Sequence, residues 1–205
     1  MDQDAKWREL RELRARVQTL EAELAGAGQP REWPPRSFYT TYAVLAGFVL
    51  GGAGAMASLL FNVVGSLLVH QHPLRLIQVY LTFPLGESGL GLDSGLALAV
   101  GCCLYLLTGM VLGIPFQLVL SRWFPSSPAP VRLLVVSALG LALWLINYYV
   151  LLAWLQPLLI GGNWIVAQVP WWVAALTHLV FAWTMLLVQP LGRFVVAADY
   201  APEAS

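Results

Sequence analysis

Charged side chains are nearly absent from the larger part of this chain. Asp, Glu, Lys and Arg make up 11% of the 205 residues, against about 25% in a typical soluble domain. Between Thr41 and Gly192 only five residues carry a charge: Arg75, Glu87, Asp93, Arg122 and Arg132. Such long charge-free stretches need an apolar solvent, because a soluble protein would need far more polar surface than they supply. The sequence therefore predicts an integral membrane protein held in a lipid bilayer.

Several other features that would mark a chemical function are scarce or missing. The formal net charge is zero, so there is no electrostatic case for a nucleic-acid partner. The two cysteines, Cys102 and Cys103, are adjacent in an apolar run, where neither a disulfide nor a metal site with spaced ligands is expected. The histidines His70, His72 and His178 give only a weak metal or haem pattern. With no nucleophile elbow, phosphate-binding loop or metalloprotease motif either, we expect no catalytic residue, metal or cofactor.

Charge is concentrated at the N-terminus, where residues 1–25 predict a cytoplasmic amphipathic helix. Apolar residues recur there at spacings of 3, 4, 3 and 4, with Glu and Arg on the flanks, as in the a/d seam of a coiled coil. The seam consists of Leu10, Leu13, Val17, Leu20 and Leu24. It spans only about two heptads, so it fits self-association or docking, and equally a short helix lying on the protein or on lipid headgroups. Residues 26–37 follow as a linker rich in Gly and Pro.

Residues 38–193 predict an all-α membrane domain, a bundle of four transmembrane helices. Four apolar runs exceed or match the length of about 20 residues that crosses a bilayer, and they cover residues 41–69, 96–120, 133–155 and 171–191. Between the first two runs, residues 74–83 predict a helix lying in the membrane interface, because Arg75, Gln78 and Thr82 fall on one face. Residues 194–205 are expected to form a cytoplasmic tail.

The positions of the basic residues predict the orientation of this bundle. Seven Lys and Arg residues precede the first span, and four spans place both chain ends on one side of the membrane. With that side cytoplasmic, Arg122, Arg132 and Arg193 also lie inside and Arg75 lies outside, which satisfies the positive-inside rule. We therefore expect a multi-pass protein of a bacterial-type inner (plasma) membrane, with both termini in the cytoplasm.

A weak internal similarity indicates that the four spans form two tandem helical hairpins. Residues 57–62 align with residues 142–147; each segment ends in Asn, and a Pro-Leu pair follows ten or eleven residues later. Residues 105–113 of the second span likewise align with residues 178–186 of the fourth. Both hairpins would cross the membrane in the same sense, as in a parallel repeat.

Small residues recur in the first two spans at helical spacing. Without a hydrophobic driving force between helices in lipid, small residues let backbones approach closely. The positions are Gly47, Gly51, Gly54, Gly109 and Gly113. The pattern favours packing inside the bundle, and association with another membrane protein is the alternative.

Polar residues inside the spans are the best candidates for a functional site. At about 1.5 Å per residue, Asn62, Asn147 and His178 lie about 10–12 Å below the outer surface, and Tyr105 and Thr108 are at similar or slightly deeper levels. We therefore predict one polar cluster in the outer half of the bundle. A buried polar group in lipid must be paired, so the cluster is either a hydrogen-bonded lock between helices or a substrate or proton site.

Two short stretches resemble a known group of proteins. Residues 178–182 read His-Leu-Val-Phe-Ala, and residues 109–113 of the other hairpin read Gly-Met-Val-Leu-Gly. In these stretches the chain resembles uncharacterised four-helix inner-membrane proteins of bacteria, the YagU-like group, over about residues 43–192. The resemblance implies a four-helix membrane fold and brings no reaction with it. Ala182 stands where the group would lead us to expect Gly.

Taken together, the sequence favours a non-enzymatic accessory or scaffold protein. Its expected partners are the lipid bilayer and either further copies of itself, as a homo-oligomer, or other membrane proteins. The first alternative is a small-solute or proton transporter or channel that uses the polar cluster. The second is a membrane enzyme acting on lipid or quinone, which the lack of paired acids and bases makes less attractive.

Overall fold

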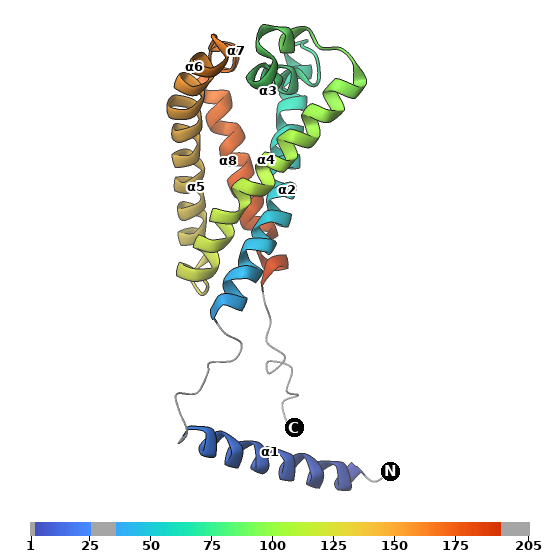
Figure 1. Cartoon of the computed structure of the whole chain (residues 1–205), viewed down its shortest axis with the longest axis vertical. Coiled ribbons are helices and arrows are strands. Elements are labelled where there is room, and N and C mark those ends of the chain that lie inside the picture. Colours follow the sequence, from blue (N-terminus) through green and yellow to red (C-terminus); the bar gives the residue numbers. More distant parts are fainter. Residues whose placement is uncertain (1–2, 26–35, 194–205) are drawn as a thin grey trace. The chain divides into compact units, whose positions relative to one another are not determined.

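The computed structural model describes residues 3–25 and 36–193, so most of the predicted linker and the whole C-terminal tail lie outside the described residues. The described part is helical and contains no β-strand. The chain divides into two compact units, with the boundary between Tyr39 and Thr40. The first unit contains α1 (Gln3–Ala25), and the second contains the helical bundle (Figure 1).

In the described part of the chain, four helices are long and apolar enough to cross a membrane. They are Tyr39–Leu68, Gly95–Trp123, Ala129–Ile160 and Trp171–Gly192. The shortest has 22 residues, which gives a length of about 33 Å against about 30 Å for the hydrocarbon core of a bilayer. These ranges begin and end within a few residues of the four predicted spans, except that the third helix is longer at both ends than the predicted 133–155.

The long helices are built from the following elements. The first two are α2 (Arg36–Leu68) and α4 (Gly95–Trp123). The third begins as α5 (Ala129–Leu145), widens to a π-helix, η2 (Ile146–Leu155), and ends as α6 (Gln156–Ile160). The fourth is α8 (Trp171–Val188), extended by the 3₁₀ turn η3 (Gln189–Gly192). Pro157 lies two residues after the end of η2 and has no N–H to donate to the preceding turn, which accounts for irregular helix at that point.

Short helices join the long ones. The connection between α2 and α4 contains α3 (Arg75–Leu85) and the 3₁₀ helix η1 (Gly86–Gly91), and the connection between α6 and α8 contains α7 (Trp164–Gln168). Gly86 ends α3 with a φ of 65°, and Gly161 ends α6 with a φ of 89°, a conformation that favours glycine. Figure 1 shows α3, α6 and α7 together at one end of the bundle, where they are in contact.

The short helix predicted over 74–83 is present as α3, and two residues of its predicted polar face are buried in the protein. Gln78 and Thr82 are 4% and 0% exposed. Gln78 donates to the Leu92 carbonyl at 2.9 Å, and Thr82 accepts a bond from Gln156 at 3.0 Å. The polar face of α3 is therefore turned into the protein, because other parts of the chain offer it hydrogen-bond partners.

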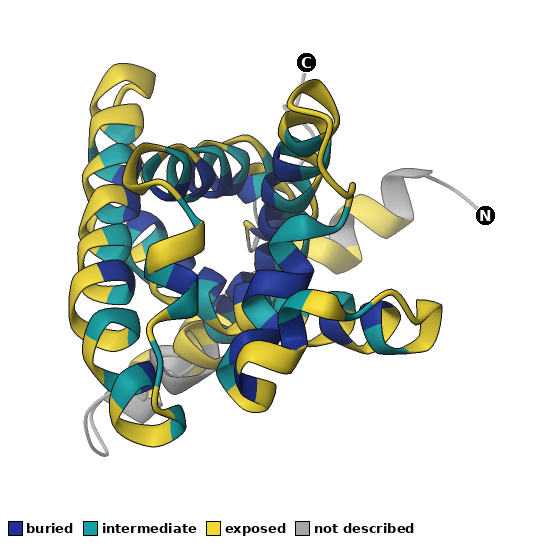
Figure 2. Cartoon of the chain, turned by 90° about the horizontal axis from the view of Figure 1, so that it is seen from above, coloured by how far each residue is buried: buried dark blue, intermediate teal, exposed yellow. Residues whose placement is uncertain are grey.

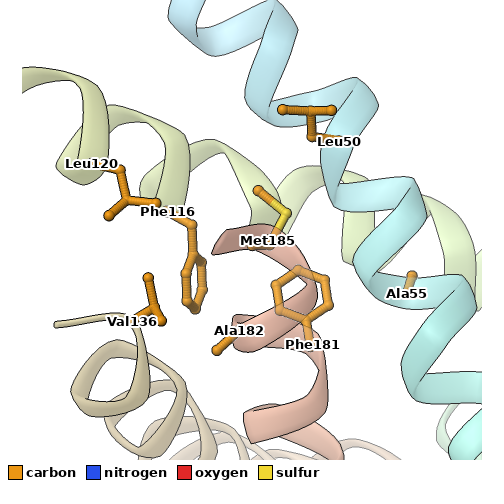
Figure 3. Close-up of a cluster of buried hydrophobic side chains, with 8 residues drawn as sticks. All are labelled: Leu50, Ala55, Phe116, Leu120, Val136, Phe181, Ala182 and Met185. Carbon is orange, nitrogen blue, oxygen red and sulfur yellow. The ribbon is translucent and has the colours of Figure 1, made fainter. Parts of the chain in front are cut away.

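A cluster of buried apolar side chains joins all four long helices. Its members are Leu50, Ala55, Phe116, Leu120, Val136, Phe181, Ala182 and Met185 (Figure 3). Phe116 and Phe181 meet edge to face, with ring centroids 5.5 Å apart, an arrangement that aromatic pairs prefer. Viewed from above, the buried positions of the bundle face its interior and the exposed ones its outer surface (Figure 2).

Glycines let α2 and α4 cross with their backbones in contact. A Cβ added to Gly113 would lie 2.5 Å from the Cα of Gly51 and still closer to the Gly47 carbonyl oxygen. A Cβ on Gly109 would overlap the side chain of Ala55. Gly54 faces α8 instead, where its Cβ would lie 2.9 Å from the Phe181 ring. All five glycines singled out in the sequence are therefore packed against other helices of the same chain.

Candidate functional site

A cavity of about 510 Å³ lies among α2, α3, α4, α5, η2, α7 and α8. Most of its lining is apolar, with Leu, Val, Phe and Ile side chains from all of these helices except α2, which contributes Ala55. The polar side chains on its walls include Ser58, Tyr105, Thr108, Asn147, Thr177 and His178. Among the described residues that line the cavity there is no Asp, Glu, Lys or Arg. The site therefore offers a hydrocarbon-like interior with uncharged hydrogen-bonding groups.

Two hydrogen bonds connect the α2 wall of the cavity to its neighbours. The Ser58 hydroxyl is 2.9 Å from the Tyr105 hydroxyl of α4. One turn further along α2, the Asn62 amide nitrogen donates to the Thr177 hydroxyl of α8 at 2.9 Å. Both Ser58 and Asn62 are buried, at 2% and 7% exposure. These bonds hold α2, α4 and α8 together just behind the cavity surface.

A further pair of polar side chains, from η2 and α8, also lines the cavity. The Nδ2 atom of Asn147 lies 3.3 Å from Nε2 of His178, and Nδ1 of His178 lies 2.7 Å from the Ala174 carbonyl oxygen. A carbonyl oxygen can only accept a hydrogen bond, so we assign the ring proton of His178 to Nδ1. The Nε2 atom then accepts a hydrogen bond from the Asn147 amide. His178 is thereby held neutral in one orientation, with its ring edge at the cavity.

The cavity reaches the outer surface of the bundle beside α4. Leu104, Leu107 and Thr108 line it and are also exposed. Thr108 lies near the midpoint of α4, and its hydroxyl is 2.7 Å from the Tyr80 hydroxyl of α3. The opening is therefore on the side of the bundle, at mid-height of a long apolar helix, and carries a pair of hydroxyl groups.

The end of the cavity is closed by α3 and α7, which Gln156 connects. This side chain is 0% exposed. Its Nε2 donates to the Thr82 hydroxyl at 3.0 Å, and its Oε1 accepts from the backbone N–H of Ile165 at 3.1 Å. At the edge of the same contact, Arg75 donates to Oε1 of Gln168 at 3.0 Å. A single buried amide thus fixes the two helices that cover the cavity.

The structure places the five polar residues predicted to cluster as follows. Tyr105, Thr108, Asn147 and His178 all line the cavity. Asn62 does not, but it is bonded to Thr177, which does. The five side chains take part in four separate bonded pairs, and among the five only Asn147 and His178 are bonded to each other.

Several candidate residues have no distinctive sequence pattern. Ser58 and Thr177 are small polar residues in apolar helices, and Gln156 follows the end of the predicted third span. A polar contact at the other end of the bundle was not predicted either: Gln189 accepts bonds from Arg132 and Arg193. The only signal in the sequence was the presence of Gln and Thr in charge-free segments, where an uncompensated polar group is costly.

Among the described residues, no group of three or more His, Cys, Asp or Glu side chains is placed to hold a metal ion. Cys102 and Cys103 are both free thiols.

In comparisons with protein-family models, with curated proteins and with solved structures, nothing matched this chain.

Proposed function

We propose that this chain is a multi-pass membrane protein that binds a neutral, mostly hydrocarbon molecule with a hydrogen-bonding head group, such as a neutral lipid or a quinone. One observation carries the proposal: the cavity is apolar and uncharged, contains hydroxyl, amide and imidazole groups, and opens on the side of the bundle at the midpoint of α4. Sites for small molecules are typically apolar spaces of 300–1,000 Å³ with a few placed polar groups.

Membrane insertion explains why the bundle has so apolar an outer surface. Side chains such as Leu60, Leu96 and Leu134 are 63%, 77% and 72% exposed, and in water a surface of this kind would aggregate. With the N-terminus in the cytoplasm, Arg122, Arg132 and Arg193 lie on the inner side and Arg75 on the outer side, as the positive-inside rule requires. A side opening at mid-membrane would then admit a molecule already dissolved in the lipid.

The accessory-protein hypothesis receives less support from the bundle itself. The small-residue faces that could have bound another membrane protein are occupied within the chain, where Gly51 meets Met110 and Gly113 meets Gly47. The exposed seam of α1 is the feature that still supports an association, and it is independent of the cavity.

The test is photolabelling of the full chain in lipid nanodiscs. The probe is a long-chain alcohol with a diazirine in its alkyl chain, and labelled residues are mapped by mass spectrometry. We expect labelling at Leu112, Leu143 and Leu152, which line the cavity and are half-buried. Competition with a short-tailed quinone and, separately, with a diacylglycerol distinguishes the two kinds of head group. The matching alkane, which lacks the hydroxyl, should compete about tenfold less well, because it cannot form a hydrogen bond with the hydroxyl, amide or imidazole groups of the wall.

Two variants of α4 provide a matched comparison. Thr108→Trp places a large ring at the mouth of the cavity, whereas Val111→Trp places the same ring on an exposed position that does not line it. Labelling of the lining should fall at least about tenfold in Thr108→Trp and stay unchanged in Val111→Trp. Equal labelling in the two variants, or labelling spread evenly over the outer surface, would show that the probe reports only surrounding lipid, and the proposal would be abandoned.

A further inference from the structure

The N-terminal helix α1 carries an apolar stripe that is open to its surroundings. Leu13, Val17 and Leu20 are 56%, 51% and 50% exposed, and Leu10 is 36% exposed. Leu24 is the fifth seam residue, and its side chain is not among those that the structure describes. A helix of 23 residues whose other faces are mostly polar gains little stability from an exposed seam, and short helices usually need a partner along such a stripe.

The charges beside the seam identify the partner. With Leu10 and Val17 at a positions and Leu13 and Leu20 at d positions, Glu9 falls at g and Arg14 at e. In a parallel, in-register pair, each g side chain faces the e side chain five positions later in the other helix. Glu9 then faces Arg14 of the other copy, and in the next heptad the sequence sets Arg16 against Glu21 in the same way. Every such pair has opposite charges.

An antiparallel pair built on the same four apolar residues reverses this pattern. In that arrangement g faces g and e faces e. Arg14 would face Arg14 of the other copy, Arg16 would face Arg16, and Glu9 would face Glu23. Each of these contacts joins like charges, which are unfavourable at helical interfaces.

We propose that α1 joins two copies of this chain as a parallel, in-register coiled coil. The partner is a second copy because the seam and its flanking charges are self-complementary. They are so in the parallel pair and not in the antiparallel one. Two heptads give a weak coiled coil, but two bundles held in one bilayer raise the effective concentration of their α1 helices and compensate for the short length. The pairing involves no cavity residue, so it stands or falls separately from ligand binding.

Cysteine cross-linking of the full chain in lipid vesicles tests the arrangement. In a background with Cys102→Ala and Cys103→Ala, Leu13→Cys and Leu20→Cys each place a thiol at a d position. We expect both variants to form a disulfide-linked dimer under mild oxidation. The control is Ala15→Cys, an exposed residue of the same helix on the face opposite the seam, which should remain monomeric. Cross-linking at Ala15 as strong as at Leu13 would overturn the proposal.

A charge exchange tests the specificity of the pairing. In a Leu20→Cys background, Glu9→Arg turns two attractive contacts of the dimer into repulsive ones, and each exposed ion pair is worth a factor of about two. We therefore expect dimer formation to fall about tenfold in Glu9→Arg and to recover in Glu9→Arg combined with Arg14→Glu. No loss in the single variant, or no recovery in the double one, would contradict the assigned register. A monomer in which the thiol of Leu13→Cys is protected from a water-soluble thiol reagent only on anionic vesicles would assign the seam to the lipid surface and overturn the dimer.

Discussion

Replacing Gly113 with alanine should separate the two helices that cross at this residue. The added Cβ would lie 2.5 Å from the Cα of Gly51 and 2.9 Å from its nitrogen, whereas ordinary contact begins at 3.4 Å. These neighbours belong to the backbone of α2, so no side chain can rotate away, and the helices must move apart by about 1 Å. Such overpacking costs about 3 kcal/mol at the upper end of its usual range. Alanine returns about 1 kcal/mol through its higher helix propensity, and the net loss is about 2 kcal/mol.

Gly65→Ala is the matched control for this change. Gly65 lies inside α2, and a Cβ there would have no atom within 4 Å. The same substitution should therefore leave stability unchanged or raise it by up to about 1 kcal/mol. Unfolding of the purified full chain in mixed micelles of increasing SDS content, followed by far-UV circular dichroism, measures both variants against the wild type. If Gly113→Ala and Gly65→Ala unfold at the same SDS fraction, the backbone contact between α2 and α4 is not present as described.

Three further predictions concern buried polar side chains, and the same unfolding assay measures all of them. Gln156→Leu should cost about 1–3 kcal/mol, because it leaves the Ile165 N–H without a partner and removes a bond to the Thr82 hydroxyl, which still donates to the Val79 carbonyl; a loss below about 0.5 kcal/mol would contradict the bridging role. Gln117→Leu should cost less than about 1 kcal/mol, since it breaks one bond to Gly192 and also removes an Oε1 atom that has no partner. A double-mutant cycle of Asn147→Leu and His178→Phe should give a coupling of about 0.5 kcal/mol, in keeping with a bond of 3.3 Å, and a coupling of zero would argue against the pair.

The long helices and the glycine contacts were predictable because their signals are local. An apolar run of sufficient length determines a helix regardless of the rest of the chain, and the four runs gave bounds close to those found. The alignment of the two hairpins also has a counterpart in the packing. Under the alignment, Ala55 corresponds to Gly140 and Gly109 to Ala182; a Cβ on Gly109 would overlap Ala55, and one on Gly140 would lie 2.9 Å from the Cβ of Ala182.

The inward polar face of α3 and the Gln156 bridge were not predictable, because their partners are distant in sequence. Gln156 bonds to Thr82, which is 74 residues away. From sequence alone, a polar stripe on a short helix indicates a face towards water. Only the positions of α6 and α7 show that other parts of the protein cover this face of α3. The π-helical form of η2 sets the position of Asn147, and no local periodicity of the sequence predicts it.

The arrangement of the two hairpins favours a binding site over a purely structural lock among the polar residues. Within each hairpin the helices touch closely, at Ala55 with Gly109 and at Gly140 with Ala182. The hairpins also touch where Gly54 meets Phe181, but beside that contact the chain leaves about 510 Å³ of space, with Thr108 of the first hairpin and Asn147 of the second on its walls. A lock would gain from close packing, because empty space forfeits dispersion contacts. Under the proposed function, a ligand in this cavity would supply those contacts and stabilise the bundle.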